Sequence, residues 1–454
     1  MRKSNDLITK DIKKLIFQIA IPSSVGMFFN TMYNVVDTFY VGLISTVAIS
    51  ALSYSFIVYF MLLSISFGLS SAITVYVGNS LGKGRNSLAR IYAMNGMSFF
   101  AIVSVLLCGF GYVWSEDIFI LMGAKDEALE LALGYTYIIL IGTVPMLLGL
   151  GANAVLVVRG DTKSYRNTLI FGFFANLLLN PIFMYGYGII PSFGFSGVAL
   201  ATVLIQFINF FYIFSKLYET KFFDFKSFFS HLPNLKVYKH LLTQAVPASL
   251  NMFLMSLGTM IVSYFISDYG YKEVAAFGIG YRVEQIILLP MLGLNIAVST
   301  IVANNFGAKN YERIDEVIKK SLLYGYIMSG IGVLFLAIFG KYIVMIFSRD
   351  SVVIDVAYSY IVVESIIFFA FITIFISNST LQGIKKPLAV PIISFYRQIL
   401  MPSIILYFVV KVWQLDIIFV WLSMMVIVYS AAVVIFIFTR KKLEEFNTKK
   451  VLLS

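Results

Sequence analysis

Five charged side chains interrupt long apolar stretches of this sequence and are the first candidates for chemistry. Three are acids, Asp37, Glu284 and Glu364, and two are bases, Arg282 and Arg397. A charged side chain at the centre of a bilayer costs roughly 2.5–3.5 kcal/mol on insertion scales, so such residues usually mark function. We interpret Arg282 and Arg397 as structural charges. Glu284 and Glu364 are either their partners in a buried ion-pair network or part of a substrate cavity.

Asp37 differs from the other four because the apolar segments of its half contain no lysine or arginine that could neutralise it. Its carboxyl group must therefore carry a proton, bind a cation or face water. At 100° per residue, Asn30, Tyr33, Asn34 and Asp37 fall on one face of a helix. This polar face predicts a binding site for H⁺, or for Na⁺, near Asp37.

Amide and hydroxyl groups in three further apolar segments can complete this site. Asn176 and Asn180 lie one turn apart, Thr202 and Gln206 do so in the next segment, and Asn153 lies in the segment before. Their oxygens are hard ligands suited to Na⁺. The alternative is that these amides only join helices. We assign ion or proton coupling to Asp37, Asn34, Asn176, Asn180 and Thr202, and the substrate cavity to Asn30, Tyr33, Asn153, Gln206, Glu284 and Glu364.

The elements that position these residues are apolar segments. The chain has 454 residues, of which 59% are hydrophobic and 13% charged, with a mean hydropathy of +0.88. This composition excludes a soluble enzyme, a disordered chain and a secreted disulfide scaffold. The pattern predicts an all-α membrane protein with twelve transmembrane helices. The segments lie at about 15–41, 48–77, 90–113, 129–157, 167–188, 194–215, 241–267, 273–304, 321–346, 353–382, 387–411 and 416–439.

The distribution of lysine and arginine predicts the orientation of these helices. The N-terminal tail, the loops after even-numbered segments and the C-terminal tail hold 27 of the 34 basic residues, whereas the loops after odd-numbered segments hold 5. Because cytoplasmic loops carry an excess of basic residues, both termini are predicted to be cytoplasmic. The basic residues lie between apolar segments, so the net charge of +11 indicates contact with the lipid bilayer and not with nucleic acid.

An internal repeat at an offset of 225 residues divides the chain into halves. Pro22 and Ser24 match Pro247 and Ser249, and the same register later aligns Asn79 with Asn304. Six helices in each half predict two lobes related by a pseudo-two-fold axis along the membrane normal. We expect an N-terminal lobe over 1–215, a cytoplasmic linker over 216–240 and a C-terminal lobe over 241–454. Pro22 and Pro247 lie inside helices, where each is either a hinge or a static kink.

Several chemistries are excluded by what the sequence lacks. A single cysteine, Cys108, permits no intramolecular disulfide, and His231 and His240 are too few for a zinc cluster. The stretch Gly78–Gly84 has three residues between its first two glycines and no hydroxyl residue after the lysine, so it is not an ATP-binding loop. A membrane-embedded transferase would need paired acids for Mg²⁺ at a membrane face, whereas the acidic cluster at 126–130 is predicted to lie on an external loop. We therefore expect no enzyme activity and no cofactor.

Four stretches resemble the multidrug and toxic compound extrusion (MATE) transporters, above all their bacterial DinF-like and MepA-like members. They are AIPSSVGMFFNTMYNVVDTFYVGL in the first helix, VLVVRGDTK, VANNFGAKNYERID and STLQGIKKP. The resemblance spans nearly the whole chain. It implies a V-shaped central cavity between two six-helix lobes, and export coupled to the entry of H⁺ or Na⁺.

The resemblance also implies roles for particular residues. Asp37 and Pro22 match the carboxylate and the proline of the first helix in DinF-like members, and Asn176 and Thr202 match their cation or proton cluster. Asn180 stands where those members have a second acid, so one carboxylate remains. The acids of NorM-like members in helices 7 and 10 are absent, since Met255 and Phe371 stand at those positions.

The function predicted from the sequence is secondary antiport for multidrug efflux, with a role in antibiotic resistance. We expect export of amphipathic, cationic organic compounds in exchange for H⁺ or Na⁺. The chain is expected to act as a monomer in the cytoplasmic (inner) membrane of a bacterium, with small organic molecules and the bilayer as its partners. The first alternative is a flippase or exporter of a lipid-linked or anionic substrate on the same fold, and the second is the membrane-embedded transferase.

Overall fold

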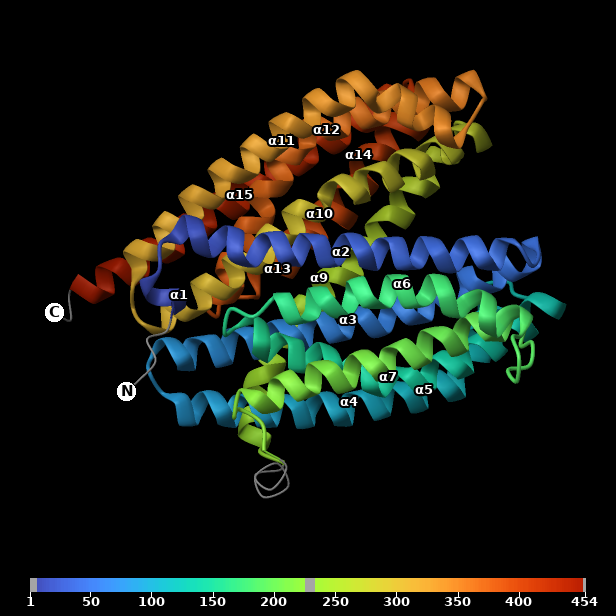
Figure 1. Ribbon diagram of the computed structural model, residues 1–454. Helices are drawn as coiled ribbons and strands as arrows, with labels where there is room; N and C mark the ends of the chain where they lie inside the picture. The colour runs from blue at the N-terminus through green and yellow to red at the C-terminus, as the bar shows by residue number, and fades with distance from the viewer. Residues whose placement is uncertain (1–5, 225–232, 452–454) are drawn as a thin grey trace. The chain divides into compact units, whose positions relative to one another are not determined.

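The computed structural model describes residues 6–224 and 233–451, and these ranges are built from α-helices joined by short turns (Figure 1). The helices are α1 (Asp6–Thr9), α2 (Ile12–Gly42), α3 (Thr46–Gly82), α4 (Asn86–Leu121), α5 (Asp126–Val157), α6 (Lys163–Tyr185), α7 (Phe195–Glu219), α9 (Leu235–Ile266), α10 (Tyr271–Gly307), α11 (Tyr311–Phe347), α12 (Ser351–Gly383), α13 (Ala389–Phe395), α14 (Met401–Leu406) and α15 (Ile417–Val451). Two π-helical turns, η1 (Tyr396–Leu400) and η2 (Tyr407–Val412), flank α14.

The prediction of twelve membrane-spanning helices is confirmed. In the described part of the chain, twelve helices are long and apolar enough to cross a membrane, with Ala389–Val412 counted as one. Several extend beyond the apolar segment that predicted them. Helix α11 begins ten residues before its apolar segment, in a polar turn where Lys319 and Lys320 pair with Asp315 and Glu316 one turn earlier. Hydropathy therefore marks only the apolar part of a helix, and the helix itself is longer.

The repeat is visible in the helix boundaries. Helices α3, α4 and α5 begin at Thr46, Asn86 and Asp126, and α10, α11 and α12 begin 225 residues later, at Tyr271, Tyr311 and Ser351. The second, third and fourth spanning helices of each half therefore begin in one register, and Pro22 and Pro247 align the first spanning helices in the same register. The two halves differ most in their fifth spanning helix, which is the continuous α6 in the first half and the interrupted series α13 to η2 in the second.

The chain forms two compact units. The N-terminal unit consists of residues 25–224 and 233–249, and the C-terminal unit of residues 6–24 and 250–451. In the N-terminal unit, α5 packs against α3, α4 and α7, and α6 packs against α7. In the C-terminal unit, α12 packs against α10, α11 and α15. Both unit boundaries lie inside helices, α2 and α9, whereas the sequence placed the division at 216–240. Of that expected linker, residues 225–232 lie outside the described residues.

Each unit includes a helical segment that the sequence repeat assigns to the other half of the chain. In each case this segment packs closely against a glycine. In the C-terminal unit, Ser24 of α2 donates through Oγ to the carbonyl of Pro290, at 3.4 Å, beside Gly293. In the N-terminal unit, Ser249 of α9 donates in the same way to the carbonyl of Ile65, also at 3.4 Å, beside Gly68. A Cβ atom on either glycine would collide with backbone atoms of the facing helix, so glycine permits this close approach.

We expect Gly293→Ala to destabilise the C-terminal unit by about 1–3 kcal/mol, because the added methyl group has no space beside Ala20 and Ser24. The measurement is the melting temperature of the purified protein in detergent. Gly330→Ala is the matched control, since no atom lies within 4 Å of the position its Cβ would take. Equal melting temperatures for the two variants would show that the contact at Gly293 can relax.

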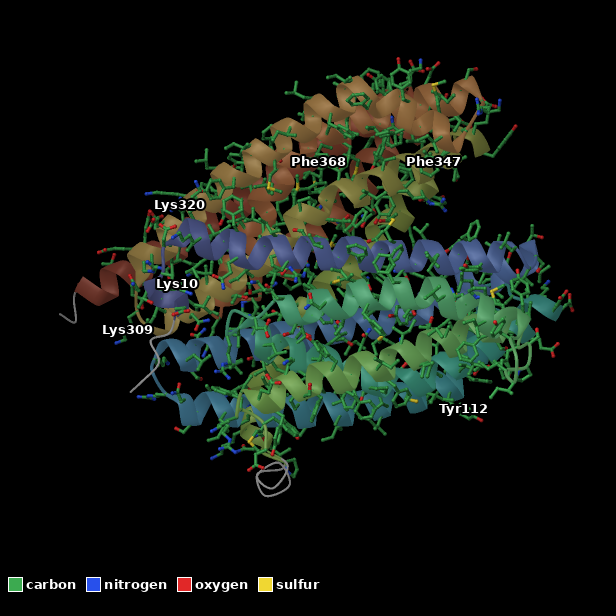
Figure 2. The ribbon with its side chains drawn as sticks, viewed as in Figure 1. Lys10, Tyr112, Lys309, Lys320, Phe347 and Phe368 are labelled. Carbon is green, nitrogen blue, oxygen red and sulfur yellow. The ribbon has the colours of Figure 1, made fainter. Side chains whose placement is uncertain are left out.

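Basic side chains gather at one end of the C-terminal unit. Lys10, Lys309 and Lys320 lie together at that end, and Phe347 lies at the opposite end (Figure 2). Arg313 at the same end donates through Nη2 to the carbonyl of Lys10, at 2.6 Å, and so ties the segment before α2 to the start of α11. This arrangement agrees with the grouping of basic residues in the sequence, and the cytoplasmic location of this end remains a prediction.

Candidate functional site

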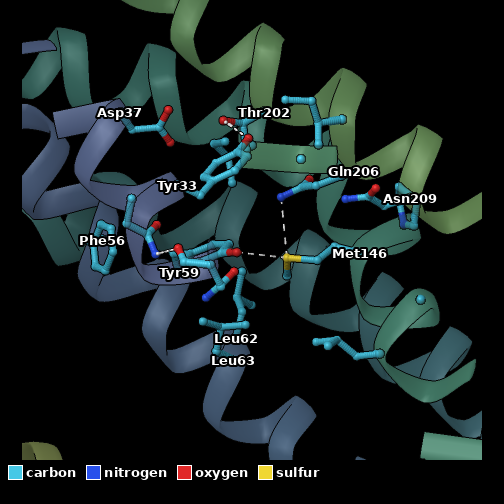
Figure 3. Close-up of a pocket in the computed structure, with 18 of the residues that line it drawn as sticks. Tyr33, Asp37, Phe56, Tyr59, Leu62, Leu63, Met146, Thr202, Gln206 and Asn209 are labelled. Atoms are coloured by element: carbon cyan, nitrogen blue, oxygen red, sulfur yellow. Dashed lines mark hydrogen bonds between the residues drawn. The ribbon is translucent and has the colours of Figure 1, made fainter. Parts of the chain in front are cut away.

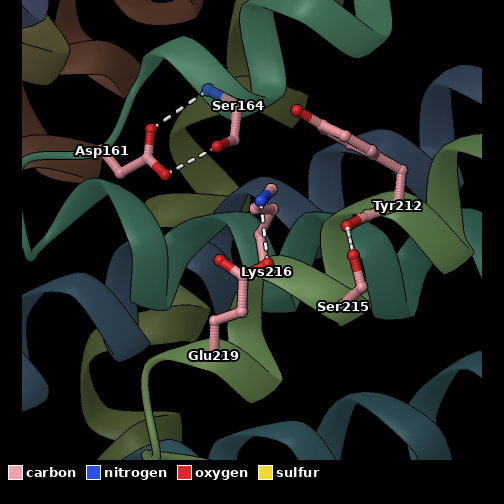
Figure 4. Close-up of polar contacts among 6 residues, drawn as sticks. All are labelled: Asp161, Ser164, Tyr212, Ser215, Lys216 and Glu219. Carbon is pink, nitrogen blue, oxygen red and sulfur yellow. Dashed lines mark hydrogen bonds and ion pairs between the residues drawn. The ribbon is translucent and has the colours of Figure 1, made fainter.

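Helix α6, which carries the two asparagines of the expected coupling site, is fixed at its start by a carboxylate cap. Asp161 accepts the backbone N–H of Ser164 through Oδ1, at 3.0 Å, and the Ser164 hydroxyl through Oδ2, at 2.6 Å (Figure 4). The neighbouring helix α7 ends with an ion pair between Lys216 and Glu219, at 2.8 Å. An acidic cap satisfies N–H groups that would lack partners in the first turn. The register of α6 is thereby set from one end.

Asp37 of α2 meets both asparagines of α6. Its side chain is 6% exposed, and its Oδ1 atom accepts from Nδ2 of Asn176, at 2.7 Å, and from Nδ2 of Asn180, at 2.9 Å. Asn180 also donates to Oδ1 of Asn176, at 3.2 Å. Both asparagines are fully buried. The one-turn spacing read from the sequence therefore places two amide donors on one carboxylate oxygen.

Asp37 borders a cavity of about 190 Å³ inside the N-terminal unit. Tyr33 donates its hydroxyl to Oγ1 of Thr202, at 3.0 Å, in the wall next to Asp37 (Figure 3). Helices α2, α3, α5, α6 and α7 all contribute to the lining. Among the described residues that line it, Asp37 is the only aspartate, glutamate, lysine, arginine or histidine. The cavity thus combines one carboxyl group with neutral walls.

The walls of this cavity are aromatic and include one methionine sulfur atom. Tyr59 donates its hydroxyl to Sδ of Met146, at 3.2 Å, and Nε2 of Gln206 approaches the same sulfur at 3.5 Å (Figure 3). Tyr135 and Tyr165 complete the polar aromatic lining. The sequence did not single out Tyr59 or Met146, because the chain has 28 tyrosines and 18 methionines and no spacing rule separates cavity residues from packing residues. Such walls adapt to ligands of different shape.

The other three asparagines assigned to this site differ in their surroundings. Asn34 lines the cavity, but its amide donates to the carbonyl of Asn30, at 3.0 Å, and not to Asp37. Asn30 borders the cavity with an exposed side chain. Asn153 does not line it, and the Asn153 Oδ1 atom is buried without a hydrogen-bond donor in the described part of the chain. The sequence can therefore assign a residue to the correct helix, but the packing of the helices determines which neighbour its side chain contacts.

Two of the expected membrane acids meet one base in the C-terminal unit. Glu284 and Glu364 are each 7% exposed and Arg397 is 5% exposed, and all three line a cavity of about 90 Å³. Arg282 is not a member of this cluster, contrary to the expectation of a four-charge network, because its side chain is exposed. Residues two positions apart on a helix point about 200° apart, so Arg282 and Glu284 cannot share a face.

Pro22 and Pro247 lie within the continuous helices α2 and α9, and both proline side chains are buried. Each proline lacks the N–H group that would bond to the carbonyl four residues earlier. Each also lies two residues before the serine that contacts the neighbouring helix, Ser24 or Ser249. A hinge at these positions remains a prediction.

Comparison with known proteins gives one family and several relatives. A family model described as MatE matches residues 22–182 and 247–408, which is most of the chain and follows the repeat. A protein of Shewanella oneidensis named "FAD transporter" is 24% identical and covers 88% of this chain and 89% of its own length. The "Probable multidrug resistance protein YoeA" of Bacillus subtilis is 28% identical, covering 68% of each chain.

A solved structure shares the fold. It is described as the outward-facing conformation of a multidrug resistance MATE family transporter of the MOP superfamily. It matches 98% of this chain and 99% of its own, with a TM-score of 0.91 at 23% identity. At this identity the likeness concerns the fold, and the roles of individual side chains depend on the geometry described above.

Proposed function

Because the chain belongs to the MatE family of multidrug efflux transporters, we propose that it is a secondary antiporter that exports amphipathic, cationic organic compounds in exchange for protons. The observation that carries this proposal is the buried Asp37 carboxyl group, the one acidic or basic side chain among the described residues lining the larger cavity. A carboxyl group in such a place can bind a proton or attract an organic cation, but the two compete. Competition for one carboxylate is the simplest basis for exchange.

The orientation of the amides supports H⁺ over Na⁺ as the coupling ion. Asn176 and Asn180 turn their N–H groups, and not their oxygens, toward Asp37. A Na⁺ ion needs several oxygen ligands directed at one point. Two amide donors on one carboxylate oxygen stabilise the ionised form, and protonation of the other oxygen would relieve the burial of a charge. Asp37 would then be loaded with H⁺ from outside and release it to the cytoplasm.

The walls of the cavity support an aromatic or lipophilic cation as the substrate. Aromatic rings attract a cation placed over their faces, and the thioether of Met146 is adaptable and polarisable. Tyr33, Tyr59 and Gln206 add polar groups that can satisfy a ligand in more than one orientation. This combination suits a family of amphipathic compounds better than a single metabolite.

An anionic substrate is the second candidate, because one relative is named a FAD transporter. Against it, the larger cavity has no lysine, arginine or histidine among its described lining residues. Arg397 in the smaller cavity is accompanied by two glutamates. Neither cavity therefore provides the positive charge that a phosphate-bearing substrate would require.

The proposed setting is the cytoplasmic membrane of a bacterium. The protein would be multi-pass with both termini in the cytoplasm, as the distribution of basic residues predicts. We propose a monomer as the working unit and H⁺ as the only co-reactant. Lys309 lies in a loop predicted to be cytoplasmic and Lys125 in a loop predicted to be external. Replacing each with cysteine and labelling it from one side of the membrane would test the orientation of the protein.

Transport in proteoliposomes tests the function. With an acidic lumen, we expect uptake of the lipophilic cation tetraphenylphosphonium, because H⁺ leaving down its gradient drives the cation inward. The same vesicles should not accumulate FAD. A Na⁺ gradient at equal pH on both sides should give only background uptake. Tetraphenylphosphonium uptake that needs Na⁺ at zero pH gradient would contradict proton coupling, and uptake of FAD would favour the second candidate.

A further inference from the structure

The C-terminal unit contains a charge cluster that the proposed exchange at Asp37 does not use. Glu284 comes from α10, Glu364 from α12 and Arg397 from the π-helical turn η1, and the three side chains face one small cavity. Gly280 leaves room for the ring of Tyr360, which reaches the cavity from α12. π-Helical turns often occur at functional sites because they present residues that a regular helix would point elsewhere.

The charges of this cluster do not balance. Two carboxylates and one guanidinium leave one negative charge in excess, and all three groups are more than nine-tenths buried. Arg397 makes no direct ion pair with either glutamate in the described ranges. Its guanidinium lies over the ring of Phe371, 5.3 Å from the centroid, and beside the amide of Gln398. An unbalanced buried carboxylate requires a proton or a cation.

The hydrogen bonds distinguish the two glutamates. Tyr360 donates its hydroxyl to Oε2 of Glu284, and a donor of this kind stabilises the ionised form of a carboxyl group. Glu364 makes no hydrogen bond or ion pair with any described residue, although it faces the cavity. Glu284 is therefore the carboxylate that balances Arg397. Glu364 is the group left without a partner.

The titratable groups around Glu364 come from three elements. Helix α10 contributes Glu284 and Tyr281, α12 contributes Tyr360, and η1 contributes Arg397. The lining residues from α9 and α15 carry no titratable side chain. A metal cation at Glu364 would have to approach the guanidinium of Arg397, and no group of three or more histidine, cysteine, aspartate or glutamate side chains that could hold a metal ion occurs in the described part of the chain. A proton avoids both difficulties.

We propose that Glu284, Glu364 and Arg397 form a second proton-binding site, separate from Asp37, in which Glu364 holds one exchangeable proton. The site binds H⁺ when Glu364 faces the cavity as a neutral acid and releases it when the carboxylate is exposed to water or to a base. This inference goes beyond the proposed function, since a proton can be titrated at Glu364 whether or not the protein transports cations.

Infrared difference spectroscopy of the purified protein tests the site, with carboxylic acids recognised by the shift of their C=O band in D₂O. The measurements use an Asp37→Asn background, which silences the first site. At neutral pH we expect the band of one buried carboxylic acid, lost on titration to alkaline pH. Adding Glu364→Gln should remove the band. Adding Asp355→Asn should leave it unchanged, because Asp355 lies on the same helix but is exposed and paired with Lys341.

Two further variants make the charge balance itself testable. With Glu284→Gln, Glu364 becomes the only counter-ion of Arg397, so the band should disappear even though Glu364 is present. With Arg397→Gln, neither carboxylate is balanced, so the band should double. A band that persists in the Glu364→Gln protein, or an Arg397→Gln protein with an unchanged band, would overturn the proposal. Loss of the parent band on adding Na⁺ at constant pH would also overturn it, by showing a metal-cation site.

Discussion

Asp37→Asn should abolish gradient-driven export while leaving the protein folded and inserted. Asparagine keeps the size of the side chain and can still bond to Asn176 and Asn180, but it can neither bind nor release a proton. Uptake of tetraphenylphosphonium into vesicles with an acidic lumen should therefore fall to the level of vesicles without protein. Binding of the same cation, measured by calorimetry, should weaken because the cavity loses the only charged side chain among its described lining residues.

Asp117→Asn is the matched control for this variant. Asp117 is an exposed carboxylate near the end of α4, outside the lining of both cavities, so its loss should leave uptake unchanged. Asp37→Glu should retain part of the activity, since the longer acid still titrates but cannot keep both amide contacts at their present lengths. Normal uptake by a well-expressed Asp37→Asn protein would remove Asp37 from the coupling mechanism and transfer the role to Glu364.

Asn180→Asp should make transport depend on Na⁺. The substitution replaces an amide donor, now 2.9 Å from Asp37 Oδ1, with a second carboxylate. Two carboxylates at this distance cannot both stay ionised unless they share a proton or a cation. In Na⁺-free buffer the two carboxylates should hold a shared proton more tightly than Asp37 alone does. Proton release, and with it export, should then slow about tenfold, which is the effect of one pKa unit. Added Na⁺ should restore part of the rate.

Asn209→Asp provides the comparison. Asn209 lines the same cavity but makes no hydrogen bond to Asp37, so its replacement adds an acid without forming a carboxylate pair. Transport by this variant should remain independent of Na⁺. If Asn180→Asp and Asn209→Asp respond alike to Na⁺, the effect comes from the added charge alone. The role assigned to the geometry of α6 would then be wrong.

The fold could be predicted from the sequence because its determinants repeat along the chain. The twelve apolar segments and the 225-residue repeat are each defined by many residues. An uncertain assignment at one position therefore does not change the predicted fold. Helical spacing places Asn176 and Asn180 on one face, and their ligand chemistry together with the resemblance to DinF-like members associated that face with Asp37. Local periodicity was sufficient for the helices and for the shared face, but not for the contact between helices.

The rest of the site could not be predicted, because it depends on which faces meet. Tyr59 and Met146 contact one another from α3 and α5, 87 residues apart, and nothing local distinguishes them from packing residues. Arg282 was grouped with Glu284 because both interrupt an apolar segment of the same half, where two acids could balance two bases, although the two side chains point to different sides. The interruption of the eleventh spanning helix by η1, which presents Arg397, has no signal that the sequence analysis used.

The location of the first helical turns also has a consequence for biosynthesis. Leu15, Ile16 and Ile19 are fully buried in the core of the C-terminal unit, whose other residues begin at position 250. At about 5–20 residues per second, a ribosome needs roughly 10–45 seconds to reach that position. The N-terminal unit can complete its packing when residue 249 has emerged, but the segment made first must wait for partners made last. Lipid or the insertion machinery must shelter this apolar segment throughout that interval, so changes near the start of the chain should affect the maturation of its end.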